Sequence, residues 1–289
     1  MNLLMCLNDG YVYPLINLMH SIRKYNSDKI NLFVLSTKLG QSSQELIKEK
    51  LGQMNIDLNI SIVEVKQFEV AKNQHYTFDM FLRVFAFNIL PKNVDKILYL
   101  DADMIAVDDI SKIYNTDLEN KLFGVVRDFG VKFKKVKKYV DSLNVGHTYF
   151  NSGMILMNIS KMREKWNIAQ IEQFIKDNGA RYSCPDQDVL NLLSKKEELV
   201  FFDDGFNFQI KNNEKLKYDK VVLIHYVGYN KPWNHLLLSR HEKLFWKNYD
   251  ELNLPEFYKQ RKIFRRKRIK MIFYKIVIKI KKIFKKNRV

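Results

Sequence analysis

The sharpest chemical feature of the sequence is a pair of aspartates, Asp101 and Asp103, directly after the apolar run 97–100. In an extended chain, residues i and i+2 face the same side and lie roughly 6.6 Å apart at the backbone. Two carboxylates placed in this way can bind one hard divalent cation. Acids after a strand also cap turns, as we expect for Asp108 and Asp109. The pair alone leaves both interpretations open.

A histidine after a second apolar run could complete such a metal site. The run 221–224 predicts a strand that ends at His225, whose imidazole nitrogen is a common metal ligand. Gly228 would let the backbone approach a phosphate closely, and Lys231 would supply a compact positive charge. The same segment is also compatible with a surface histidine followed by a turn.

Two further segments carry polar side chains where a helix or a strand begins. Pro185 predicts a helix start, and Asp186 and Gln187 follow it. Because proline and acids favour the first helical turn for structural reasons, this pattern needs no function to explain it. Asn151 precedes an apolar run at 154–157, and it either binds a sugar hydroxyl or holds a turn.

The elements that position these residues alternate between strand and helix. Strands are predicted at 3–7, 30–35, 58–65 and 97–100. Between them, a helix opens at a capping box at 42–45 and closes at Gly52, and another covers 81–88 and ends before Pro91. This order predicts an α/β fold with a mostly parallel sheet and helices on both faces, and further strands are expected near Val125, at 154–157 and at 221–224. Ligands of such sheets bind at the carboxyl ends of the strands, which points to residues 8–11 and the aspartate pair.

Composition limits the class of protein. The chain has 289 residues, of which 46% are hydrophobic and 13% aromatic, and this excludes a disordered or collagen-like protein. Two cysteines, Cys6 and Cys184, cannot form a disulfide framework and indicate a reduced compartment. The first residues do not resemble a signal peptide, and no run of 18 apolar residues predicts a membrane-spanning helix.

The net charge of +17 is concentrated at the end of the sequence. Residues 259–289 contain 15 Lys and Arg and no acid, whereas the first 258 residues contain 34 basic and 32 acidic side chains. As a helix, this tail gathers its apolar side chains within an arc of about 120°, flanked by lysines. These apolar residues are Ile269, Ile272, Phe273, Ile276, Ile280, Ile283 and Phe284. The stripe favours an in-plane helix on an anionic membrane surface, and no nucleic-acid partner is expected.

Four segments together resemble glycosyltransferase family 8, especially bacterial α-galactosyl- and α-glucosyltransferases that act on cell-surface glycans. The segments are LYLDADMI, YFNSGMILMNI, PDQDVLNLL and HYVGYNKPW, and the resemblance covers about residues 1–250 in the expected order. It implies the GT-A fold, which contains a Rossmann-like sheet. It also implies a nucleotide-sugar donor, usually a UDP-sugar, a Mn²⁺ or Mg²⁺ ion, and transfer with retention of anomeric configuration.

The resemblance also implies roles for individual residues. Asp101, Asp103 and His225 match the metal ligands. The donor-binding residues are Asn8 and Tyr11 at the uridine, Ala102 between the aspartates, and His75, Gly228 and Lys231 at the diphosphate. Arg83, Asn151, Asp186 and Gln187 match the catalytic residues around the donor sugar. This sequence has Asn8 and Gly10 where the family often has Asp and Asn. Retention by a covalent intermediate would need Asp186 or Gln187 as nucleophile, and front-face attack is equally tenable.

We therefore expect a catalytic domain over residues 1–255 and a basic amphipathic tail over 256–289. The expected activity is transfer of a hexose from UDP-galactose or UDP-glucose to a cell-surface glycan or glycolipid, in the cytoplasm at the inner face of the membrane. Two alternatives are a non-catalytic membrane- or nucleic-acid-binding protein on a degenerate transferase fold, and a nucleotidyltransferase. The intact aspartate pair, His225 and Lys231 argue against the first, and the absence of a Gly-rich basic loop at 7–11 argues against the second.

Overall fold

The computed structural model describes residues 1–64, 78–178, 183–210, 220–228, 231–233 and 240–252, and nine further residues between 263 and 277. The chain divides into two compact units. Unit 1 contains Met1–Gln209 and Lys217–His225, and unit 2 contains Ile210–Leu216 and Tyr226–Val289. Both sheets of the described chain lie in unit 1.

The main sheet has seven strands in the order β3-β2-β1-β4-β7-β6-β8. Their bounds are β1 Asn2–Cys6, β2 Ile30–Ser36, β3 Ile56–Ile62, β4 Lys96–Leu100, β6 Phe123–Arg127, β7 Phe150–Asn158 and β8 Leu199–Phe201. All neighbouring pairs are parallel except those of β7, which runs antiparallel to β4 and to β6. The predicted mostly parallel sheet is therefore confirmed.

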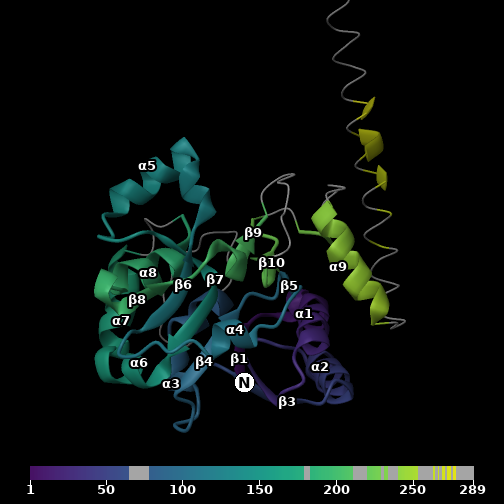
Figure 1. Ribbon diagram of the computed structural model, residues 1–289, viewed down its shortest axis with the longest axis horizontal. Helices are drawn as coiled ribbons and strands as arrows, with labels where there is room; N and C mark the ends of the chain where they lie inside the picture. The colour runs from purple at the N-terminus through teal and green to yellow at the C-terminus, as the bar shows by residue number, and fades with distance from the viewer. Residues whose placement is uncertain are drawn as a thin grey trace, which may run out of the picture. The chain divides into compact units, whose positions relative to one another are not determined.

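Helices cover the two faces of this sheet (Figure 1). On one side lie α1 Val12–Tyr25 and α2 Gln41–Gln53, and on the other lie α6 Ile159–Lys165, α7 Ile168–Asn178 and α8 Pro185–Leu193. The inner strands read as continuous apolar runs because both of their faces are buried: Leu3, Leu4 and Met5 of β1 are all inaccessible to solvent. The edge strand β3 instead alternates apolar residues with exposed polar ones.

A small second sheet follows the aspartate pair. It joins β5 Met104–Ala106, β10 Leu223–His225 and β9 Phe208–Gln209 in the order β5-β10-β9. Strand β10 is antiparallel to β5, so that His225 pairs with Met104. This pairing places the end of β10 beside Asp103.

Shorter elements connect these strands. They are η1 Asp9–Tyr11, η2 Phe78–Arg83, α3 Ala86–Ile89, α4 Ser111–Tyr114, η3 Phe129–Lys132, α5 Lys134–Leu143, η5 Lys196–Glu198 and η6 Asp204–Asn207. Two of the predicted helices differ from the structure. The expected helix over 81–88 is instead the 3₁₀ segment η2 followed by the single turn α3. A tertiary contact holds the start of this segment, since the Asp79 carboxylate accepts from the Thr37 amide after β2, and Arg83 Nε donates to the Met80 carbonyl.

Helix α2 begins one residue before the predicted capping box. Its cap is Gly40, whose amide donates to the Asp9 carboxylate at 3.0 Å, and Gly52 lies inside its last turn. The strand expected at 58–65 starts earlier, at Ile56, since that residue pairs with the first residue of β2. Strand β7 likewise starts at Phe150, so Asn151 lies within a strand and not in a turn before it.

In unit 2, helix α9 Arg240–Glu251 carries an aromatic cluster. The Phe245 ring lies 5.3 Å from Trp233, 5.7 Å from Tyr226 and 6.1 Å from Tyr249, measured between centroids. The described residues between 263 and 277 are helical and exposed. Within the described chain, no helix combines the length and apolar character needed to cross a bilayer.

Candidate active site

The site lies at one edge of the main sheet. Strands β1, β4 and β6 run in the same direction and β7 runs against them, so their carboxyl ends share an edge with the start of β7. The amide of Asp101, directly after β4, donates to the carbonyl of Gly153 in β7 at 2.8 Å. The predicted site at the carboxyl ends of the strands is therefore formed by the segments that follow β1, β4 and β6 and by the start of β7.

The structure brings the three predicted metal ligands together. One donor atom from each of Asp101, Asp103 and His225 lies within 4.8 Å of the others. His225 Nε2 is 3.2 Å from Asp103 Oδ1 and 3.7 Å from Asp101 Oδ2. Metal–ligand bonds of about 2.0–2.2 Å span such separations, and two carboxylates with one imidazole suit a divalent ion such as Mn²⁺. The donor set therefore fits the metal that the sequence predicts.

A buried arginine connects Asp101, one of the predicted metal ligands, to the start of α8. Arg83 Nη2 lies 3.0 Å from Asp101 Oδ1, and Arg83 Nε lies 3.3 Å from Asp186 Oδ2. The guanidinium stacks over the Tyr99 ring, 4.3 Å from its centroid, and the Tyr99 hydroxyl donates to Asp101 Oδ1 at 2.5 Å. Oδ1 of Asp101 is thereby occupied by protein donors, and Oδ2 is the oxygen that faces His225.

Asp186 and Gln187 also face this cluster. Asp186 is 4% exposed, and burial raises the pKa of its carboxyl to about 6, although the Arg83 guanidinium opposes that shift. Gln187 Oε1 accepts from the Ser152 amide at 2.9 Å and from Asn151 Nδ2 at 3.2 Å. The side chains of Asp186 and Gln187 thus have partners in the site, beyond the helix-start preference that their positions alone suggested.

The loop after β1 supplies Asn8 and Tyr11. Asn8 caps the 3₁₀ turn η1, because its Oδ1 accepts from the Gly10 amide at 3.0 Å. Burial raises the pKa of the Tyr11 hydroxyl, and the negative charges of Asp103 and Asp101 raise it further. Tyr11 therefore lies near the predicted metal ligands Asp101 and Asp103, whereas the described contact of Asn8 is a local cap.

The remaining predicted donor-binding residues are placed as follows. Ala102 is 8% exposed between the two aspartates. Gly228 and Lys231 belong to unit 2, where Gly228 has a φ of +80° that favours glycine and Lys231 Nζ donates to the Tyr226 carbonyl at 2.8 Å. His75 lies outside the described residues.

Sequence reasoning missed several residues that complete the site. Asp128 follows β6, and its Oδ2 accepts from Gln187 Nε2 at 3.0 Å and from Asn151 Nδ2 at 3.2 Å. The strand-end rule that selects Asp101 would also have selected Asp128. Tyr99 precedes Asp101 by two residues and shares its side of the strand, which is a usable signal. Asn207, in η6, contacts His225, and no sequence motif around Asn207 predicts this contact.

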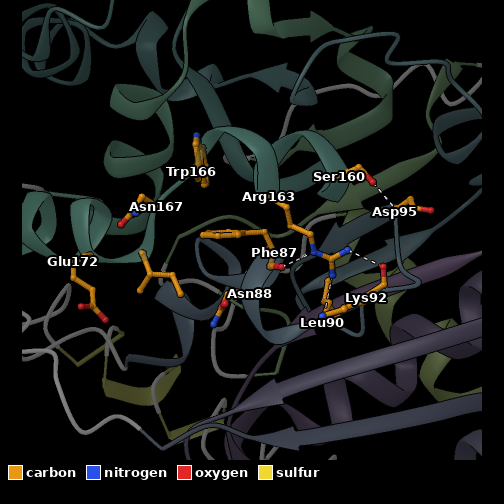
Figure 2. A pocket seen from close by; sticks show the side chains of 12 residues that line it. Phe87, Asn88, Leu90, Lys92, Asp95, Ser160, Arg163, Trp166, Asn167 and Glu172 are labelled. Carbon is orange, nitrogen blue, oxygen red and sulfur yellow. Dashed lines mark hydrogen bonds between the residues drawn. The ribbon is translucent and has the colours of Figure 1, made fainter.

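A cavity of about 1000 Å³ lies at the opposite edge of the sheet (Figure 2). Its lining includes Asp95, just before β4, and Ser160, just after β7, together with Trp166 and Arg163. Figure 2 shows the Arg163 side chain directed at α3 and the loop after it, where its guanidinium donates to one backbone carbonyl of the helix and four of the loop. The lining contains none of the predicted site residues.

The chain is similar to known glycosyltransferases in sequence. The chain is 23% identical over 269 residues to glycosyltransferase GlyF of Streptococcus pneumoniae serotype 4, covering 90% of this chain and 64% of GlyF. It is 35% identical over 173 residues to lipopolysaccharide 1,2-glucosyltransferase of Escherichia coli K12, covering 54% of this chain and 49% of that protein. The chain thus spans less than two thirds of the length of either relative.

Solved structures establish the fold. The chain is similar to galactosyltransferase LgtC in complex with donor and acceptor sugar analogs, with a TM-score of 0.76 and 21% identity over 90% of this chain and 100% of LgtC. Glycosyltransferase GlyE of S. pneumoniae TIGR4 matches with a TM-score of 0.67 and 22% identity, over 90% of this chain and 63% of GlyE. The predicted GT-A fold is therefore confirmed. The model of the family described as "Glycosyl transferase family 8" matches residues 2–236, and the chain belongs to that family.

Proposed function

We propose that this protein is a metal-dependent retaining glycosyltransferase that moves a hexose from UDP-galactose or UDP-glucose to a cell-surface glycan or glycolipid. The observation that carries the proposal is the convergence of Asp101, Asp103 and His225 beside a buried network of Arg83 and Asp186. The names of the relatives support the substrate class, since they include a lipopolysaccharide glucosyltransferase and a galactosyltransferase bound to sugar analogs.

The three metal ligands would hold Mn²⁺ at the donor diphosphate. When bound, the ion supplies positive charge that stabilises the departing nucleoside diphosphate without proton transfer. Lys231 and Gly228 approach the same diphosphate in this proposal, and Tyr11 and Asn8 contact the uridine.

The polar residues around Asn151 orient the donor sugar. The Gln187 amide oxygen accepts three hydrogen bonds and its nitrogen donates to Asp128, so both polar atoms of this amide have partners. An amide held in this way is a weak nucleophile, and Asp186 is paired with Arg83. These contacts support front-face attack by the acceptor, with Gln187 and Asp186 positioning the sugar.

The tail over 256–289 docks on an anionic membrane surface in this proposal, while residues 1–255 form the catalytic domain. Among the described tail residues, Ile269 is 53% exposed, Phe273 65% and Ile276 48%. Such apolar side chains on a helix that is rich in lysine and arginine suit an interfacial position. The enzyme would then meet a membrane-bound acceptor at the cytoplasmic face.

A thermal-shift experiment tests the proposed donor and metal. We expect UDP to raise the melting temperature of the full chain in the presence of Mn²⁺ and to have little effect without it, because bound ligands stabilise the native state. Without ligand, the variants Asp103→Ala and His225→Ala should have the same melting temperature as native protein. With UDP and Mn²⁺ together, their melting temperature should not rise. Equal stabilisation by UDP with and without Mn²⁺, in native protein and variants alike, would contradict the metal-dependent site.

A further inference from the structure

We infer that Asn207 is a positioning residue that orients the His225 imidazole for metal binding and joins it to Asn151. This inference rests on the proposed metal site. Asn207 is fully buried, and its Oδ1 lies 3.0 Å from His225 Nδ1. Its Nδ2 donates to Asn151 Oδ1 at 2.9 Å. The side chain therefore bridges a metal ligand and a residue of the donor-sugar network.

The hydrogen-bond pattern fixes the direction of each amide. Asn151 Oδ1 accepts from the Gly153 backbone amide at 3.0 Å, so it cannot be a nitrogen. Asn207 must then present Nδ2 to Asn151 and its carbonyl oxygen Oδ1 to His225. At the other end, Asn151 Nδ2 donates to Gln187 Oε1 and to Asp128 Oδ2. Each hydrogen bond in this series from His225 to Gln187 therefore joins a donor to an acceptor.

The direction of the Asn207 amide selects one tautomer of His225. Because Oδ1 can only accept, a neutral imidazole at this position must carry its proton on Nδ1. Nε2 then has the lone pair, and Nε2 is the nitrogen that lies 3.2 Å from Asp103 and 3.7 Å from Asp101. A histidine in this state is ready to bind a cation without losing a proton.

Backbone packing around Asn207 stabilises the contact between Asn207 and His225. An added Cβ at Gly205 would lie 1.9 Å from the Lys220 carbonyl oxygen, so η6 packs directly on the chain that leads into β10. The Val222 amide donates to the Gly205 carbonyl at 2.8 Å. Since Asn207 and His225 lie at the ends of these two packed segments, their separation is fixed by backbone contact.

Partners that orient a metal-bound histidine typically contribute 10- to 100-fold to metal affinity. We therefore expect Asn207→Ala to weaken Mn²⁺ binding by about that factor. Asn207→Asp keeps an oxygen acceptor for Nδ1–H and should restore affinity to within about threefold of native protein, because carboxylate–histidine–metal arrangements are common. Asn207→Leu keeps the side-chain volume without the acceptor and should behave like Asn207→Ala.

Asn191 provides a matched structural control. It is also a fully buried asparagine, and its amide bonds to the backbone of Phe150 and Gln187 and not to a metal ligand. Asn191→Ala should lower the melting temperature and leave Mn²⁺ affinity unchanged. Loss of Mn²⁺ affinity in Asn191→Ala as large as in Asn207→Ala would mean that any buried cavity loosens the site, and it would overturn the inference.

Two measurements on the full chain test the inference. Mn²⁺ affinity is measured by electron paramagnetic resonance of the free ion, and the tautomer of His225 is read from long-range ¹H–¹⁵N spectra of the metal-free protein at mildly alkaline pH. We expect the Nδ1–H tautomer in native protein and in Asn207→Asp, and a mixture in Asn207→Leu. The Nε2–H tautomer in native protein, or native Mn²⁺ affinity in folded Asn207→Leu, would overturn the inference. Absence of Mn²⁺ binding in native protein would contradict the proposed function, while the tautomer would still test the role of Asn207.

Discussion

Replacing Gly153 by alanine should remove metal binding while leaving all three ligands in the chain. A Cβ at this position would lie 2.3 Å from His225 Cε1 and 2.8 Å from Asp101 Oδ2. Carbon atoms pack at about 3.5–4.0 Å, so the imidazole must move by more than about 1 Å. Strand β7 cannot easily retreat, because the Gly153 carbonyl accepts from the Asp101 amide. Metal–ligand distances tolerate only about 0.2 Å, so this displacement breaks a coordination bond.

We expect Gly153→Ala to weaken Mn²⁺ binding by at least about 100-fold, which corresponds to ~2.7 kcal/mol. Isothermal titration with Mn²⁺ measures this loss, and circular dichroism reports the fold. Gly124→Ala is the control, because its Cβ would lie 2.4 Å from Phe202 Cζ and strain the sheet away from the metal ligands. Both variants should melt earlier, and only Gly153→Ala should lose the metal. Native Mn²⁺ affinity in folded Gly153→Ala would refute the packing argument.

Three other predictions concern Asp186, Lys231 and the tail. Because burial raises the pKa of Asp186 to about 6, the folded state binds its proton more tightly than the unfolded state, and this group costs about 1 kcal/mol of stability as the pH rises from 5 to 8. The free energy of unfolding of Asp186→Asn, measured in urea, should not show that loss. If the unfolding free energies of native protein and Asp186→Asn depended on pH in the same way, this prediction would be contradicted. Lys231→Ala should raise the KM for the donor and lower kcat, together by at least about tenfold in kcat/KM, since its charge matters most as the diphosphate leaves. Unchanged steady-state constants would exclude this role. The full chain should co-sediment with anionic but not neutral vesicles, and both a chain ending at residue 258 and the full-length variant Ile272→Ser with Phe273→Ser should stay in the supernatant. Equal sedimentation of all three proteins would eliminate the anchor.

The sequence predicted the parts of the site that follow from strand periodicity. Apolar runs that end in Asp101 and His225 are visible without a structure, and the rule that ligands gather at strand ends placed them together. Periodicity failed at residues 81–88, where the Asp79 carboxylate accepts from the Thr37 amide, 42 residues earlier in the chain, and Arg83 Nε donates to the Met80 carbonyl. Sequence periodicity does not report such a tertiary contact. It also could not show Asn207, since the contact with His225 depends on the packing of η6 against a segment 15 residues later in the chain.

The proposed metal ligands come from widely separated parts of the chain, and this has a consequence for biosynthesis. The last strand of the main sheet ends at Phe201, whereas His225 follows 24 residues later. A chain emerging from the ribosome can therefore pair all seven strands before its third ligand is available. Joining Asp103 to His225 closes a long loop, whose entropic cost must be met by contacts that form late. Competence to bind the metal therefore requires the chain to reach residue 225, and an interrupted chain that lacks this residue would carry two carboxylates and no complete site.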